Sequence, residues 1–135
     1  MVKMSAVYQG DKHCKLLHEP SSSTIETDAP KDNNGKGENF SPTDLLGAAL
    51  GSCMLTVMAI TAEKDGVNLK GSWATMEKEM VANPRRVSKL NVILHLPQNV
   101  PHDYRAKLED IAKGCPVKVS LHPDINIPIL FHYDI

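Results

Sequence analysis

The stretch that decides the fold is Ser41–Gly66, SPTDLLGAALGSCMLTVMAITAEKDG. Ser41 is suited to the N-cap of a helix, Pro42 to its first position, and Asp44 to its first turn, where an acid interacts favourably with the helix dipole. Gly66 can end the helix in the left-handed conformation that glycine adopts readily. The sequence therefore predicts a helix of roughly 24 residues, about 36 Å long.

No charged residue occurs between Leu45 and Ala62. The run is at the short end of what spans a membrane, polar residues interrupt it, and no excess of Lys or Arg flanks it. In a soluble protein, a helix that is apolar on all sides lies at the centre of the fold. We therefore expect a central helix, covered by a sheet or by a partner subunit, and no membrane association.

The rest of the chain predicts strands on both sides of this helix and two further helices. Strands are expected at 2–9, 13–18, 24–27, 67–81, 87–96 and 125–133, and helices at 102–113 and, as a short turn, 116–121. The segments 67–81 and 87–96 alternate apolar and polar residues around the turn Asn83–Arg86, which predicts an antiparallel hairpin. The chain has 135 residues without repeats or a linker, so we expect one α+β domain over 1–135.

Composition and charge argue against several functional classes. With 15 basic and 16 acidic residues the net charge is −1, which lacks the basic excess of nucleic-acid-binding proteins. Aromatic residues make up 4% of the chain, so a wide aromatic-lined cleft for flavin or haem would be hard to build, although neither cofactor is excluded. The six histidines show no metal-site spacing, so no metal is expected. The N-terminus has no apolar run of signal-peptide length, which predicts a cytoplasmic protein.

Three cysteines remain to be explained: Cys14, Cys53 and Cys115. In a reducing compartment, a separated pair of cysteines is more often redox-active than structural. Cys53 lies within the predicted central helix and needs an activating group from elsewhere. Cys115 precedes Pro116 at the start of a short helix, where unpaired backbone N–H groups favour a thiolate. The alternative is that both are ordinary core cysteines. Cys14 is expected to be incidental.

The segments SPTDLLGAALGSC (41–53) and CPVKVSLHPDI (115–125), with the order of elements around them, resemble the OsmC/Ohr family (osmotically inducible protein C and organic hydroperoxide resistance). The resemblance covers nearly the whole chain. It implies an α+β, OsmC-like fold in which an antiparallel sheet wraps a long central helix. It also implies an intertwined homodimer with active sites at the subunit interface.

The resemblance further implies a thiol-dependent peroxidase that reduces organic (alkyl or fatty-acid) hydroperoxides in oxidative stress defence. Cys53 would attack the peroxide and become a sulfenic acid, and Cys115 would then form a disulfide with it. An external dithiol, such as a dihydrolipoyl group, would reduce the disulfide, so no bound cofactor is implied. A thiolate is the reactive form of cysteine, and a sulfenic acid is reversible when a second thiol is at hand.

The chain departs from the family pattern at two positions. The family uses a Glu in the first turn of the helix, where this chain has Thr43, and we assign the role to the adjacent acid, Asp44. The family Arg from the N-terminal strands falls near Lys12, which can stabilise a thiolate as a point charge but lacks a bidentate guanidinium. Other candidates for this basic group are His13, Arg85 and Arg86. The alternatives to a peroxidase are a non-catalytic dimer that binds an apolar small molecule and a redox sensor.

Overall fold

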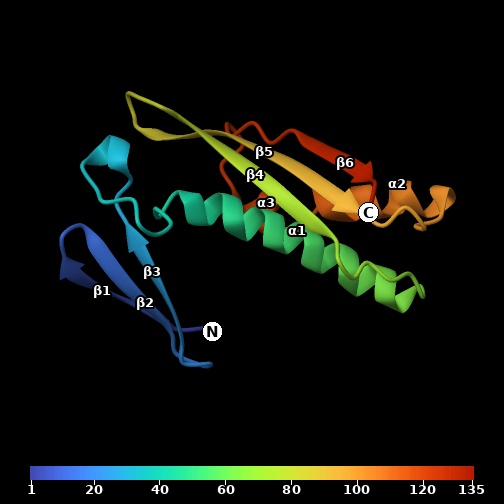
Figure 1. The fold of residues 1–135 in the computed structure, drawn as a ribbon, viewed down its shortest axis with the longest axis horizontal. Coiled ribbons are helices and arrows are strands. Elements are labelled where there is room, and N and C mark those ends of the chain that lie inside the picture. Colours follow the sequence, from blue (N-terminus) through green and yellow to red (C-terminus); the bar gives the residue numbers. More distant parts are fainter. The chain divides into compact units, whose positions relative to one another are not determined.

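The predicted long helix is present as α1 (Asp44–Lys64) (Figure 1). Two reciprocal hydrogen bonds hold its start: the Asp44 N–H donates to Ser41 Oγ (3.1 Å), and the Ser41 N–H donates to Asp44 Oδ2 (2.8 Å). This is a capping box, with Asp in place of the more usual Glu or Gln. Gly66, with a φ of 75°, follows the C-terminus in the left-handed conformation. The predicted C-terminal end of the helix is confirmed, and its regular part begins at Asp44, two residues after the predicted first position, Pro42.

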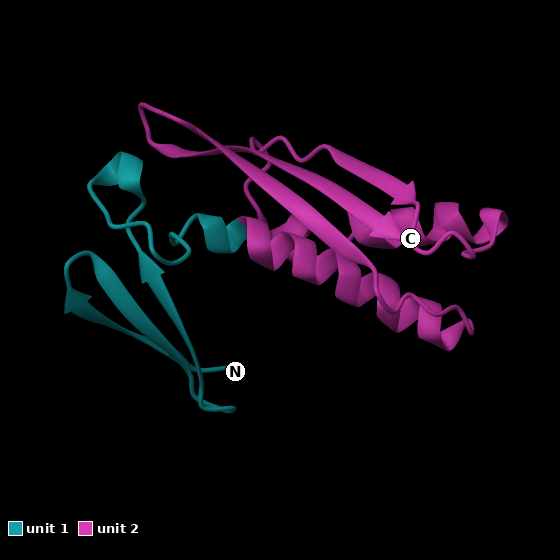
Figure 2. Ribbon diagram, viewed as in Figure 1, with its two compact units in different colours: residues 1–46 teal, residues 47–135 magenta.

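The computed structural model describes residues 1–135, and the chain forms two compact units, residues 1–46 and 47–135 (Figure 2). The boundary between the units falls within α1, so no linker separates them. The other elements are, in chain order, β1 (Met4–Gly10), β2 (His13–His18), β3 (Ser23–Asp28), the 3-10 helix η1 (Lys31–Asn33), β4 (Trp73–Val81), β5 (Arg86–Leu96), α2 (His102–Lys113), α3 (Pro116–Ser120) and β6 (Ile129–Tyr133).

Unit 1 contains a three-stranded antiparallel sheet in the order β1-β2-β3. Asp11 and Lys12 connect β1 to β2 with φ values of 52° and 59°, the left-handed values of a tight hairpin turn. In the β2–β3 register, His13 is opposite Asp28 and Cys14 is opposite Thr27. This register places the imidazole and the carboxylate of the first pair side by side.

Unit 2 contains a second three-stranded sheet in the order β4-β5-β6. β4 and β5 form the predicted antiparallel hairpin, and β6 pairs with β5 in parallel. A register shift between Glu79 and Met80 marks a bulge. The bulge allows β5 to bury one apolar face along its whole length, because the extra residue restores the alternation. The buried residues of that face are Val87, Leu90, Val92, Leu94 and Leu96.

The core of unit 2 lies between this sheet face, α1 and α2. α1 contributes a single buried stripe, which consists of Gly47, Leu50, Gly51, Met54, Met58 and Ala62. α2 contributes Leu108 and Ala112. The glycines allow close approach to the sheet, since a Cβ at Gly51 would clash with Met76 Sδ and lie 2.8 Å from its Cε. The predicted core helix is therefore present, but the sheet covers only one of its sides.

The opposite side of α1 is exposed and uncharged. Leu46 and Ile60 keep 37% and 51% of their surface exposed in the isolated chain. α1 also has the length and mean hydropathy, 1.9, of a helix able to span a membrane, and 33% of its apolar window is buried. The core helix of a soluble protein can have the same length and hydropathy.

Two predicted strand boundaries were wrong. The strand expected from residue 67 begins at Trp73. Asn68 Oδ1 accepts from the Lys70 N–H (2.9 Å), the Ser72 N–H donates to the Leu69 carbonyl (3.0 Å) and Gly71 has a φ of 91°, so a turn at 69–72 precedes the strand. The strand expected from residue 125 begins at Ile129. Pro128 precedes it and has no N–H to donate to a ladder, and only an isolated bridge, Lys89 to Asn126, extends the pairing backwards.

A row of rings crosses the outer face of the β4–β6 sheet. Trp73 stacks on His95 with ring centroids 3.9 Å apart, and His95 stacks on His132 at 5.2 Å. Nδ1 of His95 is 2.8 Å from a carboxylate oxygen of Asp134. The strand register causes this row, since Trp73 pairs with His95 and His95 pairs with His132. Trp73 is the only tryptophan in the chain.

Candidate redox site

Cys53 and Cys115 occupy contrasting positions in unit 2. Cys53 is half-buried on α1, beside the stripe that faces the sheet. Cys115 is fully buried, with 0% of its surface exposed. It is the N-cap residue of α3, with Pro116 at the first helical position, and its Sγ accepts a hydrogen bond from the Lys118 N–H at 3.4 Å. The predicted placement of Cys115 at a helix start is confirmed.

The structure brings these two thiols together. The Cys53 side chain lies beside the Cys115 thiol and raises its pKa, and both are free thiols. A long stretch of sequence separates them, so their proximity comes from packing. Cys53 lies on α1, and Cys115 follows Gly114 at the C-terminal end of α2. Two adjacent thiols of this kind can pass between a dithiol and a disulfide.

Burial raises the pKa of the Cys115 thiol above its usual value. The neighbouring Cys53 side chain adds to this increase in pKa, while the backbone N–H groups of Lys118 and Val117 oppose it. We expected the start of α3 to favour a thiolate, and this expectation is corrected: enclosure in the core outweighs the N–H groups, because a buried charge loses its hydration. Cys115 is therefore a protonated thiol at neutral pH.

Asp44 and Lys12, the expected acid and base, both belong to unit 1. The Asp44 carboxylate accepts the Ser41 N–H, so it has a structural role at the start of α1. Lys12 is exposed in the β1–β2 turn, where its N–H donates to Tyr8 Oη (3.3 Å) and its carbonyl accepts from the Ala29 N–H (3.0 Å). The roles of Asp44 and Lys12 toward the thiols stay predictions.

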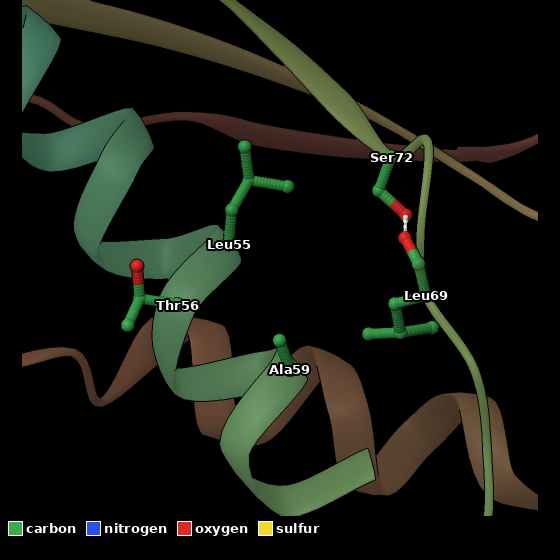
Figure 3. A pocket seen from close by; sticks show the side chains of 5 residues that line it. All are labelled: Leu55, Thr56, Ala59, Leu69 and Ser72. Carbon is green, nitrogen blue, oxygen red and sulfur yellow. Dashed lines mark hydrogen bonds between the residues drawn. The ribbon is translucent and has the colours of Figure 1, made fainter. Parts of the chain in front are cut away.

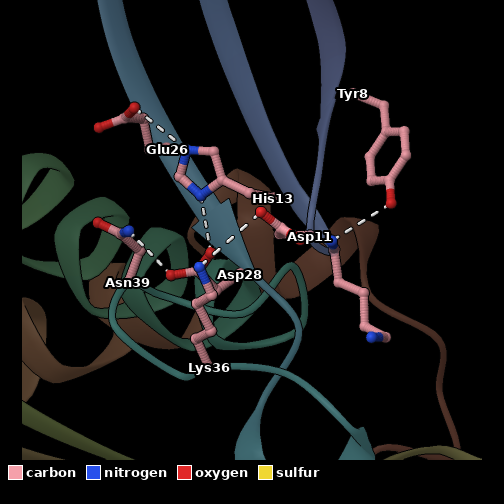
Figure 4. Close-up of polar contacts among 8 residues, drawn as sticks. Tyr8, Asp11, His13, Glu26, Asp28, Lys36 and Asn39 are labelled. Atoms are coloured by element: carbon pink, nitrogen blue, oxygen red, sulfur yellow. Dashed lines mark hydrogen bonds and ion pairs between the residues drawn. The ribbon is translucent and has the colours of Figure 1, made fainter.

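His13 is engaged on both ring nitrogens (Figure 4). Its Nδ1 is 2.7 Å from Asp28 Oδ1, and its Nε2 is 3.2 Å from Glu26 Oε1. Asn39 Nδ2 donates to the other oxygen of Asp28 at 2.9 Å. These carboxylates raise the pKa of His13, and the imidazole and Asn39 lower the pKa of Asp28. His13 is thus an ion-paired anchor of unit 1.

Sequence reasoning missed this cluster, although a signal for it was present. The strands expected at 13–18 and 24–27, joined by a short turn, place residue 13 opposite residue 28. The cluster borders a polar pocket of about 340 Å³. Its lining residues are Gln9, Gly10, Asp11, His13, Asp28, Lys36 and Glu38.

The remaining basic candidates lie around the β4–β5 turn. Arg86 Nη1 donates to the Val87 carbonyl at 3.1 Å, so part of its guanidinium is used locally. Arg85 is in the turn itself and also has a partner. No group of three or more His, Cys, Asp or Glu side chains is placed to hold a metal ion.

An apolar pocket of about 260 Å³ opens beside α1 (Figure 3). Leu55, Thr56, Ala59, Leu69 and Ser72 line it. Leu55 is two residues beyond Cys53, which places it roughly 200° around the helix. The pocket therefore faces a different side of α1 from the thiol pair.

Comparison with known proteins assigns the fold. A family model described as OsmC-like protein matches residues 35–129, which include both thiols and the whole of α1. The chain belongs to the OsmC-like family. The α+β, OsmC-like fold expected from the sequence is confirmed.

Solved structures agree with this OsmC-like assignment. A protein from Psychrobacter arcticus 273-4, whose name refers to osmotic stress induction and detoxification response, is 41% identical, with 98% of this chain and 96% of that chain covered and a TM-score of 0.93. An organic hydroperoxide resistance protein OsmC from Legionella pneumophila is 18% identical, with 98% and 96% covered and a TM-score of 0.74. An organic hydroperoxide resistance protein from Elizabethkingia anophelis is 13% identical, with 99% and 96% covered and a TM-score of 0.78. No curated protein sequence matches the chain.

Proposed function

We propose that this OsmC-like protein is a thiol-dependent peroxidase that reduces organic hydroperoxides. The observation that carries the proposal is the proximity of a half-buried thiol, Cys53, to a fully buried one, Cys115. Membership of a family with members named organic hydroperoxide resistance proteins supports the choice of oxidant. The accessible thiol suits the attack on a peroxide, and the enclosed thiol suits resolution.

The proposed reaction has two steps on the protein. The Cys53 thiolate attacks the outer oxygen of ROOH, the O–O bond breaks, and ROH leaves after taking up a proton, so that Cys53 becomes a sulfenic acid. The Cys115 sulfur then attacks the Cys53 sulfur, and water leaves as the disulfide forms. A dithiol reductant supplies two electrons and two protons to regenerate both thiols.

We assign the activation of Cys53 to Asp44 and Lys12. Lys12 is exposed at a hairpin turn and can offer a positive charge, and Asp44 can orient such a charge while it caps α1. If Lys12 activates the thiolate, Lys12→Arg will retain turnover and Lys12→Gln will lose it, with unchanged folding in both variants. Equal activity of Lys12→Gln and the wild type would remove Lys12 from the mechanism.

We further propose that the protein works as a homodimer in the cytoplasm. The uncharged side of α1 supports this assembly, because Leu46 and Ile60 are exposed in the isolated chain and burying apolar surface drives association. A second copy of α1 offers an equally uncharged surface. Light scattering at micromolar concentration should give twice the chain mass of 14.8 kDa.

A second function, non-catalytic binding of an apolar small molecule, has one observation in its favour. The apolar pocket of about 260 Å³ at Leu55 and Ala59 lies on a different side of α1 from the thiols. A ligand there would need no cysteine chemistry, so its binding would be unaffected by Cys53→Ser.

One experiment separates the peroxidase from the non-catalytic binder. Reduced protein is mixed with cumene hydroperoxide, and the loss of thiols and of peroxide is followed for the wild type, Cys53→Ser, Cys115→Ser and, as the matched control, Cys14→Ser. We expect the wild type and Cys14→Ser to consume one equivalent of peroxide and form the Cys53–Cys115 disulfide, and Cys115→Ser to consume one equivalent and remain a sulfenic acid. Peroxide loss that is no faster in the wild type than in Cys53→Ser would refute the peroxidase.

A further inference from the structure

A disulfide between Cys53 and Cys115 offers a reductant two sulfurs in very different surroundings. Cys115 has no exposed surface and is enclosed by the core of unit 2, together with Leu108 and Ala112 of α2. Cys53 is half-buried in the isolated chain and lies between the buried stripe of α1 and its exposed side, seven residues from both Leu46 and Ile60. The two sulfurs differ in access, although they belong to one bond.

Thiol–disulfide exchange depends on access to the attacked sulfur and on the stability of the departing thiolate. The attacking thiolate approaches the bond on the side opposite the departing sulfur. An attack on Cys115 would therefore come through the packed core, whereas an attack on Cys53 comes from the side away from Cys115. Protein interiors are close-packed, so the first route requires the core to open.

We propose, on the basis of the peroxidase function above, that the reductant attacks Cys53 and that Cys115 is the leaving group. The reductant thiolate RS⁻ forms a bond to the Cys53 sulfur as the Cys53–Cys115 bond breaks, and Cys115 departs as a thiolate. The proton that RSH released is then taken up by Cys115. A second thiol of the reductant attacks the RS sulfur, closes the oxidised reductant and frees Cys53 as a thiolate.

The surroundings of Cys115 match the role of a departing sulfur. The Lys118 N–H, 3.4 Å from its Sγ, points at the atom on which negative charge develops. Burial then favours the neutral form of Cys115, so the departing thiolate takes up a proton. Because the neutral thiol is a poor nucleophile, the cleavage of the disulfide becomes harder to reverse. The raised pKa of Cys115 by itself makes this thiol a poorer leaving group and slows the reduction. The enclosure of Cys115 has the larger effect, because it blocks the attack of a reductant on the Cys115 sulfur.

The experiment uses a disulfide made in two ways. Cys14→Ser protein is oxidised with cumene hydroperoxide in one arm and with diamide in the other. Excess 2-mercaptoethanol is added as the probe thiol, and early samples are quenched in acid. N-ethylmaleimide in denaturant then blocks free thiols before digestion with trypsin. Cys53 falls in the peptide Gly37–Lys64 and Cys115 in Gly114–Lys118, so mass spectrometry assigns the adduct to one sulfur.

We expect the 2-mercaptoethanol adduct on Cys53 and the N-ethylmaleimide adduct on Cys115, with an excess of about tenfold or more over the reverse pattern. Glutathione, a larger probe, should show at least the same preference. Adducts mainly on Cys115, or in comparable amounts on both, would overturn the inference. A disulfide that forms with diamide but not with peroxide would refute the peroxidase while leaving this test intact. A disulfide that forms with neither oxidant would overturn both.

Discussion

Two glycines on the buried stripe of α1, one turn apart, should respond to the same substitution with opposite signs. At Gly47, a new Cβ would lie 3.6 Å from Leu90 Cδ2 and 3.7 Å from Met76 Cβ, which are ordinary contact distances. Ala is better than Gly in a helix interior by about 1 kcal/mol. Gly47→Ala should therefore raise the free energy of unfolding by about 1 kcal/mol.

Gly51→Ala brings the same gain in helix propensity, but its new Cβ would collide with the Met76 side chain. The new Cβ would clash with Met76 Sδ, 2.8 Å from its Cε and 3.2 Å from its Cγ, so the methionine must move. Overpacking of this kind costs about 1–3 kcal/mol, which cancels or exceeds the gain. We expect Gly51→Ala to lower the free energy of unfolding by about 0–2 kcal/mol.

The assay is urea unfolding followed by far-UV circular dichroism, at one protein concentration because dimerisation would make stability concentration-dependent. Met76→Ala provides the matched background, since it removes the clashing atoms. There, Gly51→Ala should become stabilising by about 1 kcal/mol, while Gly47→Ala should keep its effect. The reasoning is refuted if both glycine variants shift the midpoint equally, or if Met76→Ala leaves the effect of Gly51→Ala unchanged.

Three further outcomes are expected. Ser41→Ala removes the capping hydrogen bond to the Asp44 N–H and should lower the free energy of unfolding by about 1 kcal/mol in urea, whereas an unchanged midpoint would count against the cap. Because burial raises the pKa of Cys115, disulfide formation in stopped-flow should accelerate by about tenfold per pH unit below that pKa, and a flat profile would contradict this assignment. The pKa of His13 is raised, so its ion pair with Asp28 contributes fully below the unfolded-state pKa and loses its contribution as pH rises through the folded-state pKa. His13→Gln should therefore lower Tm most in mildly acidic buffer, and a deficit that grows with pH would be incompatible with the pair.

Elements with a strong local signal could be predicted from the sequence. α2 has the expected bounds, because Pro101 and Gly114 delimit it. β2 also has the expected bounds, and the turn residues Asp11–Lys12 mark its start. The start of β4 could not be predicted, because Val67 and Leu69 fit the alternation of a strand, while a turn at 69–72 with side-chain hydrogen bonds precedes Trp73. The parallel pairing of β6 has no local signal, since a five-residue strand can pair in either direction.

The candidate site was predicted in part for a similar reason. Pro116 gives a local signal that Cys115 precedes a helix, and this prediction is confirmed. The complete burial of Cys115 depends on packing against residues far away in the sequence, so the direction of its pKa was predicted wrongly. The meeting of Cys53 with Cys115 was implied only by the family resemblance, because no spacing motif links them.

The stacking of Trp73 on His95 has a consequence for how this protein can be watched as it unfolds. The only tryptophan lies on β4, so tryptophan fluorescence reports on the surroundings of this strand in unit 2. Circular dichroism records the strands of both units. Superposition of the two signals in one urea titration would show a single cooperative transition, and a separation between them would show that the units lose structure in turn.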